Sequence, residues 1–545
     1  MKKSKLWFFR KLTQSIFFIF AVLIFLRFIT SSSCLLFWGA LHIFPVTAGI
    51  NSYVYTKFII VTILLIILTF SAGRLYCSYL CPVGFIQDLA AAIGTKLKIK
   101  KAAPAFYKYF RLLLFITCLA SAAFGIFIWG WLDHSSNFGR ILTDFIQPIF
   151  IKLLSPFSEY LNKTSNFQIS ELKSTSFEFL YASLFLLMLV VAAALRPRWY
   201  CNTLCPSGAI YGMIAQNSFI NIKVNENCVN CGQCAKICPA YCINNGIIDK
   251  NLCVSCYECV GKCTFGALNI SRGSSAAQNT PSQTICRKSD YNEVDNINTA
   301  QEPSQKSEIN NETEKNVNHK ISGSRRKFLT TSFTVIAGTL IPYSLKAIAQ
   351  PETLEIKTIM PPGAGTPQEF FNNCSACHLC ISVCPSKVLV PSGFENGIIG
   401  LSKPKLDYNK SYCEFECNMC SSICPNQAIK YHDIEQKKLI KIGIVELNTG
   451  TNTECVAYKN HQDCGACAEH CPTGAVYMEK LGDIFVPKIR KPYCIGCGIC
   501  QHACPVHGEH KPIKVMPLKK QGKAKDPREI NADKQLKNNT NDFPF

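Results

Sequence analysis

The chain has 545 residues, a net charge of +21 and 32 cysteines. This length is enough for several domains, and 48% of the residues are hydrophobic, which is high for a soluble protein. In a membrane protein such a basic excess usually lies in cytoplasmic loops and sets orientation. No basic stripe accompanies a known nucleic-acid-binding motif, so nucleic acid is not an expected partner.

Residues 1–215 predict an α-helical membrane domain with four transmembrane helices. A span needs about 20 mostly apolar residues. The expected spans are residues 12–32, 57–73, 110–132 and 177–195. An apolar segment at 34–50, interrupted by Gly and Pro, is predicted to be interfacial or re-entrant. Trp129 and Trp131 would place the end of the third span in the aromatic belt.

Basic residues predict the orientation of this domain. They occur at the N-terminus, in the loop 96–108 and just after Leu195. Four spans put these segments on one side of the membrane, which is expected to be the cytoplasm. The loop 133–176 would then face the periplasm.

An eleven-residue motif occurs twice in the membrane domain. Residues 74–84 read RLYCSYLCPVG and residues 198–208 read RWYCNTLCPSG, with seven of eleven positions identical. The spacing of four predicts that both thiols of a copy lie on one helical face. The preceding arginines are expected to lower the pKa of these thiols. The repetition favours a redox or ligand role over simple packing for the motif cysteines, which are Cys77, Cys81, Cys201 and Cys205. Thiol–disulfide pairs and four ligands to a shared metal or cluster are both compatible with the pattern.

Residues 222–270 form a cysteine-rich block with two C-x2-C-x2-C-x3-C runs, the spacing of bacterial ferredoxins. In such a run three thiolates on a tight loop hold one cubane, and the fourth binds the other cluster. We therefore assign one [4Fe–4S] cluster to Cys228, Cys231, Cys234 and Cys263. The second cluster is assigned to Cys253, Cys256, Cys259 and Cys238. Thr264 replaces the usual following proline, which should not prevent ligation.

Residues 271–323 are polar with almost no aromatics, which predicts a disordered linker. Residues 324–350 then combine paired Arg325 and Arg326, an apolar run and a small-x-small site at 347–349. This pattern resembles a twin-arginine export signal, and the alternative is a fifth transmembrane segment. Its place past the middle of the chain suggests two proteins joined end to end.

Residues 351–518 contain four more cysteine runs, before a polar tail at 519–545. Two runs have the standard spacing and two carry insertions. The predicted ligands are Cys374, Cys377, Cys380, Cys384, Cys413, Cys417, Cys420, Cys424, Cys455, Cys464, Cys467, Cys471, Cys494, Cys497, Cys500 and Cys504. With the first block this makes six [4Fe–4S] clusters.

Three rival interpretations of these runs are disfavoured. Zinc ribbons do not repeat a four-cysteine run so many times. Export of a folded domain loaded with clusters would avoid disulfide formation. The segment Cys374–His378 also matches the haem pattern C-x-x-C-H, but the cysteines that follow in register favour a cluster, with His378 as a loop residue. The remaining cysteines are treated as ordinary apolar or loop residues: Cys34, Cys118, Cys242 and Cys286.

These motifs resemble those of known redox subunits. Residues 1–270 resemble NapH, the membrane quinol dehydrogenase subunit of periplasmic nitrate reduction systems. NosR-type and CcoG-type polyferredoxins share its C-x-x-x-C-P element. Residues 324–520 resemble NapG and its MauM relative, a twin-arginine signal followed by four [4Fe–4S] motifs. By this resemblance the first run of the last block pairs with the fourth, and the second with the third.

The resemblance implies an electron-transfer protein of the bacterial inner membrane, with two α+β ferredoxin-like domains beside the helical one. Electrons would come from the quinone pool, with quinol as substrate, and go to a periplasmic reductase or multihaem cytochrome. The first ferredoxin domain would be cytoplasmic and the last periplasmic. A CcoG-like role in maturation or assembly of a metalloenzyme is the alternative. The sequence has no molybdopterin or flavin motif, so the terminal reductase would be another polypeptide.

Overall fold

The computed structural model describes residues 3–26, 53–97, 107–123, 129–150, 152–153, 176–244, 247–272, 356–449, 453–506 and 511–529. The predicted re-entrant segment, residues 273–323 of the predicted linker and the twin-arginine segment lie outside the described residues, whereas Ser271 and Arg272 belong to a strand. The chain divides into two compact units. Unit 1 comprises residues 1–15, 66–120 and 192–344, and unit 2 comprises residues 16–65, 121–191 and 345–545.

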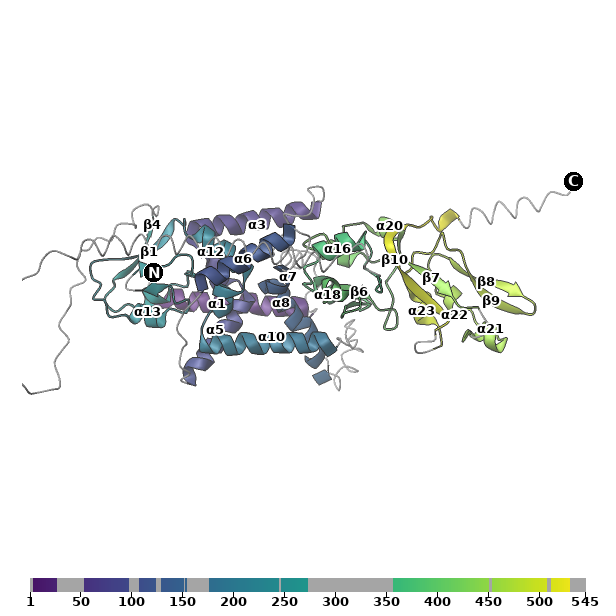
Figure 1. The fold of residues 1–545 in the computed structure, drawn as a ribbon, viewed down its shortest axis with the longest axis horizontal. Coiled ribbons are helices and arrows are strands. Elements are labelled where there is room, and N and C mark those ends of the chain that lie inside the picture. The colour runs from purple at the N-terminus through teal and green to yellow at the C-terminus, as the bar shows by residue number, and fades with distance from the viewer. Residues whose placement is uncertain are drawn as a thin grey trace, which may run out of the picture. The chain divides into compact units, whose positions relative to one another are not determined.

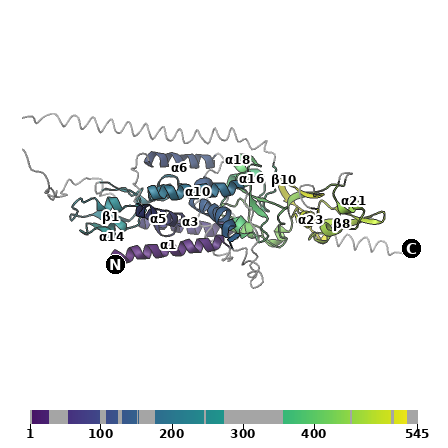
Figure 2. The ribbon, with the colours of Figure 1, turned by 90° about the horizontal axis from the view of Figure 1, so that it is seen from below.

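The predicted spans correspond to apolar helices. These are α1 (Lys3–Phe25), α3 (Tyr53–Ala72), α6 (Tyr107–Ala123) and α10 (Ser176–Leu195). Helices α1 and α10 are long and unbroken (Figure 2) and contain apolar windows at Phe8–Phe25 and Glu178–Leu195. Among the described residues these two are long and apolar enough to cross a membrane, by length and composition alone. Shorter apolar stretches lie in α3 and α6, at Ile63–Ala72 and Phe110–Ser121.

The third predicted span lies only partly within the described residues. Helix α6 ends at Ala123, and a separate short helix α7 covers Trp129–Leu132. Trp129 is buried, and the Trp131 ring lies 4.5 Å from the guanidinium carbon of Arg140. Both side chains are thus engaged within unit 2, and their place in an aromatic belt stays a prediction.

The predicted loop 133–176 begins as helix. Helix α8 covers His134–Arg140, and the π-helix η2 continues over Ile141–Ile146. Asp133 caps α8, because its carboxylate accepts hydrogen bonds from the backbone N–H groups of Ser135 and Ser136. This cap starts a helix where the sequence suggested only a connection.

Unit 1 combines short helices with a small α+β fold. Its short helices are α4 (Leu75–Tyr79), α5 (Pro82–Lys96), α11 (Trp199–Thr203) and α12 (Pro206–Ala215). The α+β part contains β1 (Ile220–Val224), α13 (Gln233–Ile237), β2 (Ile243–Asn244), β3 (Ile247–Ile248), α14 (Glu258–Lys262) and β4 (Leu268–Arg272). Strands β1 and β4 pair antiparallel, with Ile220 opposite Arg272 (Figure 1). Strands β2 and β3 also pair antiparallel, and α13 packs against α14.

Unit 2 repeats this small-element architecture. Its elements in residues 356–449 are α16 (Pro367–Asn373), α17 (Leu379–Val383), β5 (Leu389–Pro391), α18 (Gly397–Gly400), β6 (Pro404–Leu406), α19 (Met419–Ile423), α20 (Ile434–Lys437) and β7 (Ile440–Leu447). The later ones are α21 (Val456–Asn460), α22 (Ala466–Glu469), β8 (Val476–Leu481), β9 (Ile484–Ile489), α23 (Ile499–Ala503) and β10 (Ile513–Lys523). The antiparallel pairs are β5–β6, β7–β10 and β8–β9 (Figure 1). Helix α17 packs against α19, and α22 packs against α23.

Candidate functional site

The four cysteine runs with standard spacing share one backbone conformation. In each run the residues directly before and after the second cysteine have positive φ. These pairs are Asn230 and Gly232, Ser255 and Tyr257, Ala376 and His378, and Gly496 and Gly498. For a residue other than glycine this conformation costs about 1–2 kcal/mol. Such strain collects at functional sites, and it turns successive N–H groups toward a bound anion.

The last cysteine of a run ends its short helix in an extended conformation. Cys238 has φ −63° and ψ 114°, and Cys384 has φ −62° and ψ 115°. A following proline disfavours helix at the preceding residue, which explains why the helix stops there. Cys263 adopts φ −71° and ψ 108° before Thr264. The departure from proline therefore leaves the cysteine in the same conformation.

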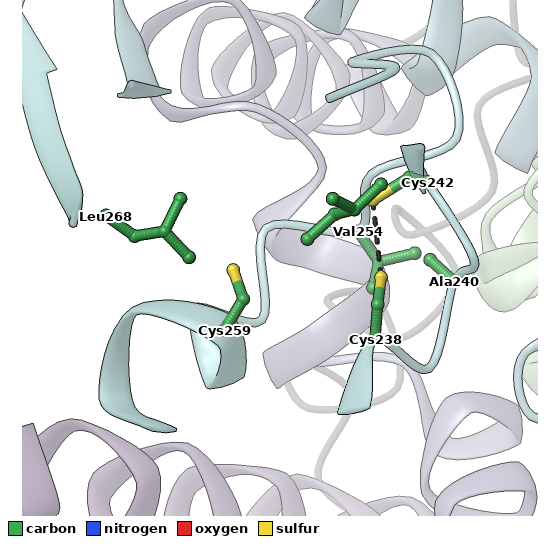
Figure 3. Close-up of a cluster of buried hydrophobic side chains, with 7 residues drawn as sticks. Cys238, Ala240, Cys242, Val254, Cys259 and Leu268 are labelled. Carbon is green, nitrogen blue, oxygen red and sulfur yellow. Dashed lines mark hydrogen bonds between the residues drawn. The ribbon is translucent and has the colours of Figure 1, made fainter. Parts of the chain in front are cut away.

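The predicted ligands of one cluster line a single cavity in unit 1. They are Cys238, Cys253, Cys256 and Cys259, and the other lining residues include Ile222, Ile243, Ile248 and Val254. Figure 3 shows the region of this cavity, where Cys259 lies in α14 and Cys238 directly follows α13. A [4Fe–4S] cluster needs four thiolates in a largely apolar pocket. The residues present fit that group.

Sequence reasoning missed Cys242, which lines the same cavity. It is buried, and its Sγ lies 3.4 Å from Cys238 Sγ (Figure 3). This hydrogen bond lowers the pKa of Cys238 to about 7, although burial raises it. The spacing of four residues from Cys238 is the signal in the sequence that would have drawn attention to Cys242.

A second cavity, in unit 2, corrects the predicted pairing of runs. It is lined by Cys374, Cys377, Cys380 and, from the second run of the last block, Cys424. The contact of α17 with α19 brings the first and second runs together, and that of α22 with α23 brings together the third and fourth. The expected pairing of first with fourth and second with third is therefore wrong. Neighbouring runs pair because the short connections between them favour local contacts.

Within the described part of the chain, no three cysteine, histidine or carboxylate side chains are close enough to hold a single metal ion. The four ligands of a cubane bind different corners of a larger body, so they stand farther apart than the ligands of one ion. Four ligands of one cubane should instead line a shared cavity, and the predicted ligands at the Cys253 loop and at the Cys374 loop each do so.

The two C-x-x-x-C-P motifs have matching geometry, but a copy's thiols do not share one helix. Cys77 lies in α4, whereas Cys81 is the extended N-cap residue of α5, with φ −71° and ψ 119°. Cys205 caps α12 in the same way, with φ −73° and ψ 113°. The prolines after Cys81 and Cys205 break the helix at these positions. The predicted common helical face is therefore wrong.

The arginine of each motif copy donates a hydrogen bond to the backbone of the other copy. Arg74 of the first copy donates a hydrogen bond to the carbonyl of Cys201 at 3.1 Å, and Arg198 of the second donates to the carbonyl of Cys77 at 2.5 Å. Each contact lies against the motif glycine. A Cβ on Gly84 would be 2.7 Å from the Cys77 oxygen, and one on Gly208 would be 2.5 Å from the Cys201 oxygen. The repeated Arg and Gly thus hold the two copies together.

The charges near the motif thiols do not outweigh their burial. Burial raises the pKa of Cys77 above its usual value, although Arg74 and Arg198 act in the opposite direction. Burial likewise raises the pKa of Cys81. The arginines thus lower the pKa of these two thiols as expected, but burial raises it by more. Gln87 donates a hydrogen bond to Cys201 Sγ at 3.1 Å, a contact that the sequence did not predict.

The cluster cavity of unit 1 lies directly on the first motif copy. Arg74 donates to the carbonyl of Leu252, the residue before the predicted ligand Cys253, at 3.4 Å. Ser78 donates to the carbonyl of Val254, the residue after it. Gly73 packs so closely on Ser255 that a Cβ there would clash with its hydroxyl. The C-x-x-x-C-P motif and the Cys253 loop are therefore one connected site.

Unit 2 contains a similar arrangement within residues 134–146, where the sequence predicted a loop and the structure has helix. Arg140 donates from Nε to the carbonyl of Ala376 at 3.0 Å, between two predicted ligands. His378 is fully buried, with Nδ1 3.0 Å from Asp144 Oδ2 and Nε2 2.8 Å from the carbonyl oxygen of Ser402. His378 lies in the loop before α17 as predicted, and its side chain forms a buried ion pair. Burial lowers its pKa, but Asp144 raises it above the usual value.

Family models match the chain in both units. A 4Fe-4S binding domain matches residues 56–100 and 179–225, which contain the two motif copies. Another 4Fe-4S binding domain matches residues 225–241 and 371–388. A 4Fe-4S dicluster domain matches residues 462–508, which join the third and fourth runs of the last block as the structure does. The chain binds iron–sulfur clusters.

Similar proteins include an uncharacterised one and two with ferredoxin-type names. An uncharacterised protein of Methanocaldococcus jannaschii is 25% identical over 279 residues, 49% of this chain and 97% of the relative. The ferredoxin-type protein NapF of Escherichia coli is 26% identical over 149 residues, 27% of this chain and 80% of its own length. The ferredoxin-type protein NapH of Escherichia coli is 25% identical over 230 residues, 40% of this chain and 68% of its own length. The chain is an iron–sulfur electron-transfer protein. No solved structure matches it.

Proposed function

We propose that this chain takes electrons from a membrane quinol and passes them through six [4Fe–4S] clusters to a periplasmic redox partner. When bound, such a cluster accepts and releases one electron at a time. The observation that carries the proposal is the contact between the first C-x-x-x-C-P motif and the Cys253 loop. This contact joins the first of the two C-x-x-x-C-P cysteine pairs to a cavity lined by predicted cluster ligands.

The chain's own residues divide the work in this proposal. The 24 cysteines of the six runs, counted in the sequence, would hold the clusters. Cys77, Cys81, Cys201 and Cys205 would carry the step between quinol and the Cys253 cavity. Burial of these thiols excludes water from that step.

The two candidate membrane helices and the NapH-like relative support a membrane location. We place the 222–270 block in the cytoplasm and the 351–518 block in the periplasm. This placement follows the basic residues near the helix ends and the paired arginines at 325 and 326. The terminal acceptor would be a separate reductase or cytochrome.

Quinol reduction of the purified, cluster-loaded chain tests the proposal. A menaquinol or ubiquinol analogue is added, and cluster reduction is followed by electron paramagnetic resonance (EPR). Cys77→Ser and Cys201→Ser are expected to keep the EPR signals of the six clusters and to slow their reduction by quinol. The matched control is Cys118→Ser, which removes a buried cysteine outside every motif. Normal reduction rates in both motif variants would show that the repeat is structural.

A further inference from the structure

Arg74 is fully buried and has only uncharged acceptors. From Nη1 it donates to Asn202 Oδ1 at 2.8 Å and to the carbonyls of Asn251 at 3.2 Å and Leu252 at 3.4 Å. Its Nη2 lies 3.9 Å from Cys77 Sγ. Among the described residues, no carboxylate forms an ion pair with Arg74, and its Nε has no hydrogen-bond partner there. A buried cation without a counter-ion is costly, so a nearby negative charge is needed to balance it.

Arg198 occupies the equivalent position of the second copy and has such a counter-ion. Its Nε and Nη2 lie 2.9 Å and 2.8 Å from the two carboxylate oxygens of Asp88. Asp88 follows Cys81 by seven residues, and the residue seven after Cys205 is Gly212. The two copies therefore match in backbone geometry but differ in charge, and only the arginine that touches the Cys253 loop lacks a carboxylate.

Arg140 repeats the arrangement in unit 2. It is fully buried, and it donates to the carbonyls of Ala376 at 3.0 Å, Ser375 at 3.4 Å and Gly130 at 3.3 Å. Its guanidinium also lies over the Trp131 ring. In the described parts of the chain it forms no ion pair with a carboxylate. In each unit, then, a buried guanidinium that forms no ion pair among the described residues donates to the backbone of a loop that lines a cluster cavity.

We propose that Arg74 and Arg140 are positioning residues that raise the reduction potentials of the clusters held by the Cys253 and Cys374 loops. The inference rests on the proposed cluster binding by these loops. One-electron reduction adds one negative charge to the site, and a fixed guanidinium beside it stabilises that charge. Net charge and hydrogen bonding around the cluster set its potential. The effect falls with distance, so each arginine should act mainly on the cluster beside it.

The test is a redox titration of the full-length, cluster-loaded chain with dithionite as electron donor, followed by EPR. Arg74→Gln should lower the potential of one cluster by about 59 mV or more, a tenfold change in the one-electron equilibrium constant. Arg74→Lys keeps the positive charge, so the potential of that cluster should stay close to its value in the unmodified protein. Arg140→Gln should lower the potential of a different cluster. Arg198→Gln is the matched control from the other copy, and it should leave all potentials unchanged while lowering thermal stability.

Unchanged potentials in Arg74→Gln with full iron content would overturn the proposal, and so would an equal shift in Arg198→Gln. If Arg74→Gln fails to retain its cluster, the test rests on Arg140→Gln. Unchanged cluster potentials in that variant would then overturn the proposal. Failure of the proposed function would look different. The unmodified protein would then lack cluster EPR signals, or would show them without being reduced by quinol.

Discussion

Arg198 and Asp88 form a doubly hydrogen-bonded ion pair inside unit 1, with nitrogen–oxygen distances of 2.9 Å and 2.8 Å. The same carboxylate lies 3.2 Å from Arg10 and 3.5 Å from Lys11. Arg10 in turn pairs with Glu258 at 2.8 Å, on the helix that carries a predicted cluster ligand. One carboxylate thus connects the N-terminal helix, the second motif copy and, through Arg10, the ferredoxin block.

Replacing Asp88 should destabilise unit 1 strongly. Asp88→Asn leaves Arg198 buried without its counter-ion, and breaking a buried pair in this way costs about 3–5 kcal/mol. Thermal unfolding of the purified protein in detergent measures the loss. The control is Asp526→Asn, which removes an exposed partner of Arg528 and should change little. Equal unfolding temperatures for Asp88→Asn and the unmodified protein would contradict the role of this network.

The same pair predicts an acid dependence. Burial alone would raise the pKa of Asp88, but Arg198, Arg10 and Lys11 lower it below its usual value. The stabilisation is therefore fully present above the unfolded-state pKa of about 4 and is lost as the pH falls through the lower folded-state value. Unfolding measured between about pH 6 and pH 3 should show a loss of stability that is reduced in Asp88→Asn. Parallel curves for the two proteins would contradict this prediction.

Cluster content provides a direct count. Six runs predict about 24 iron atoms per chain, and Cys259→Ser should remove about four of them because one cubane loses a ligand. Iron analysis with EPR makes the measurement. The matched control is Cys242→Ser, since Cys242 lines the same cavity but is not a predicted ligand. Loss of iron in the Cys242 variant alone would reverse the ligand assignment, and a protein filled with zinc would exclude it.

The motif glycines should not tolerate a side chain. In Gly84→Ala the new Cβ would meet the Cys77 carbonyl and the Arg198 guanidinium, and in Gly208→Ala it would meet the Cys201 carbonyl. Overpacking of this kind costs about 1–3 kcal/mol. Gly522→Ala is the control, because nothing lies within 4 Å of its added Cβ. Thermal unfolding should therefore separate the two motif variants from the control, and three identical midpoints would argue against close packing of the copies.

Export of the last block should depend on the paired arginines. Changing both Arg325 and Arg326 to Lys should leave the 351–518 block inside the cell, because the paired arginines are the defining feature of the export signal that this segment resembles. Protease added to spheroplasts is expected to digest this block only in the unmodified protein. A block in the unmodified protein that becomes accessible only after lysis would rule out the twin-arginine interpretation. A gel of native material would also show whether the chain is cut near Ala349.

Short-range features of this protein were predictable from its sequence. The spacing within each cysteine run defines a loop of a dozen residues, and the ferredoxin pattern of two such runs predicted the four cysteines that line the Cys253 cavity together. The apolar segments likewise predicted the positions of α1, α3, α6 and α10. The internal repeat was visible because its Arg, Cys, Pro and Gly positions recur at the same spacing.

Tertiary structure decided which distant segments meet. The exchange of Arg74 and Arg198 between motif copies joins residues separated by more than a hundred positions, and no local pattern specifies it. The same holds for the contact of Arg140 with the Ser375–Ala376 backbone. These contacts depend on how whole elements pack and on which buried charges find partners. The spacing of the cysteines determines the conformation of each loop. Which distant side chains contact that loop depends on burial and charge in the folded chain.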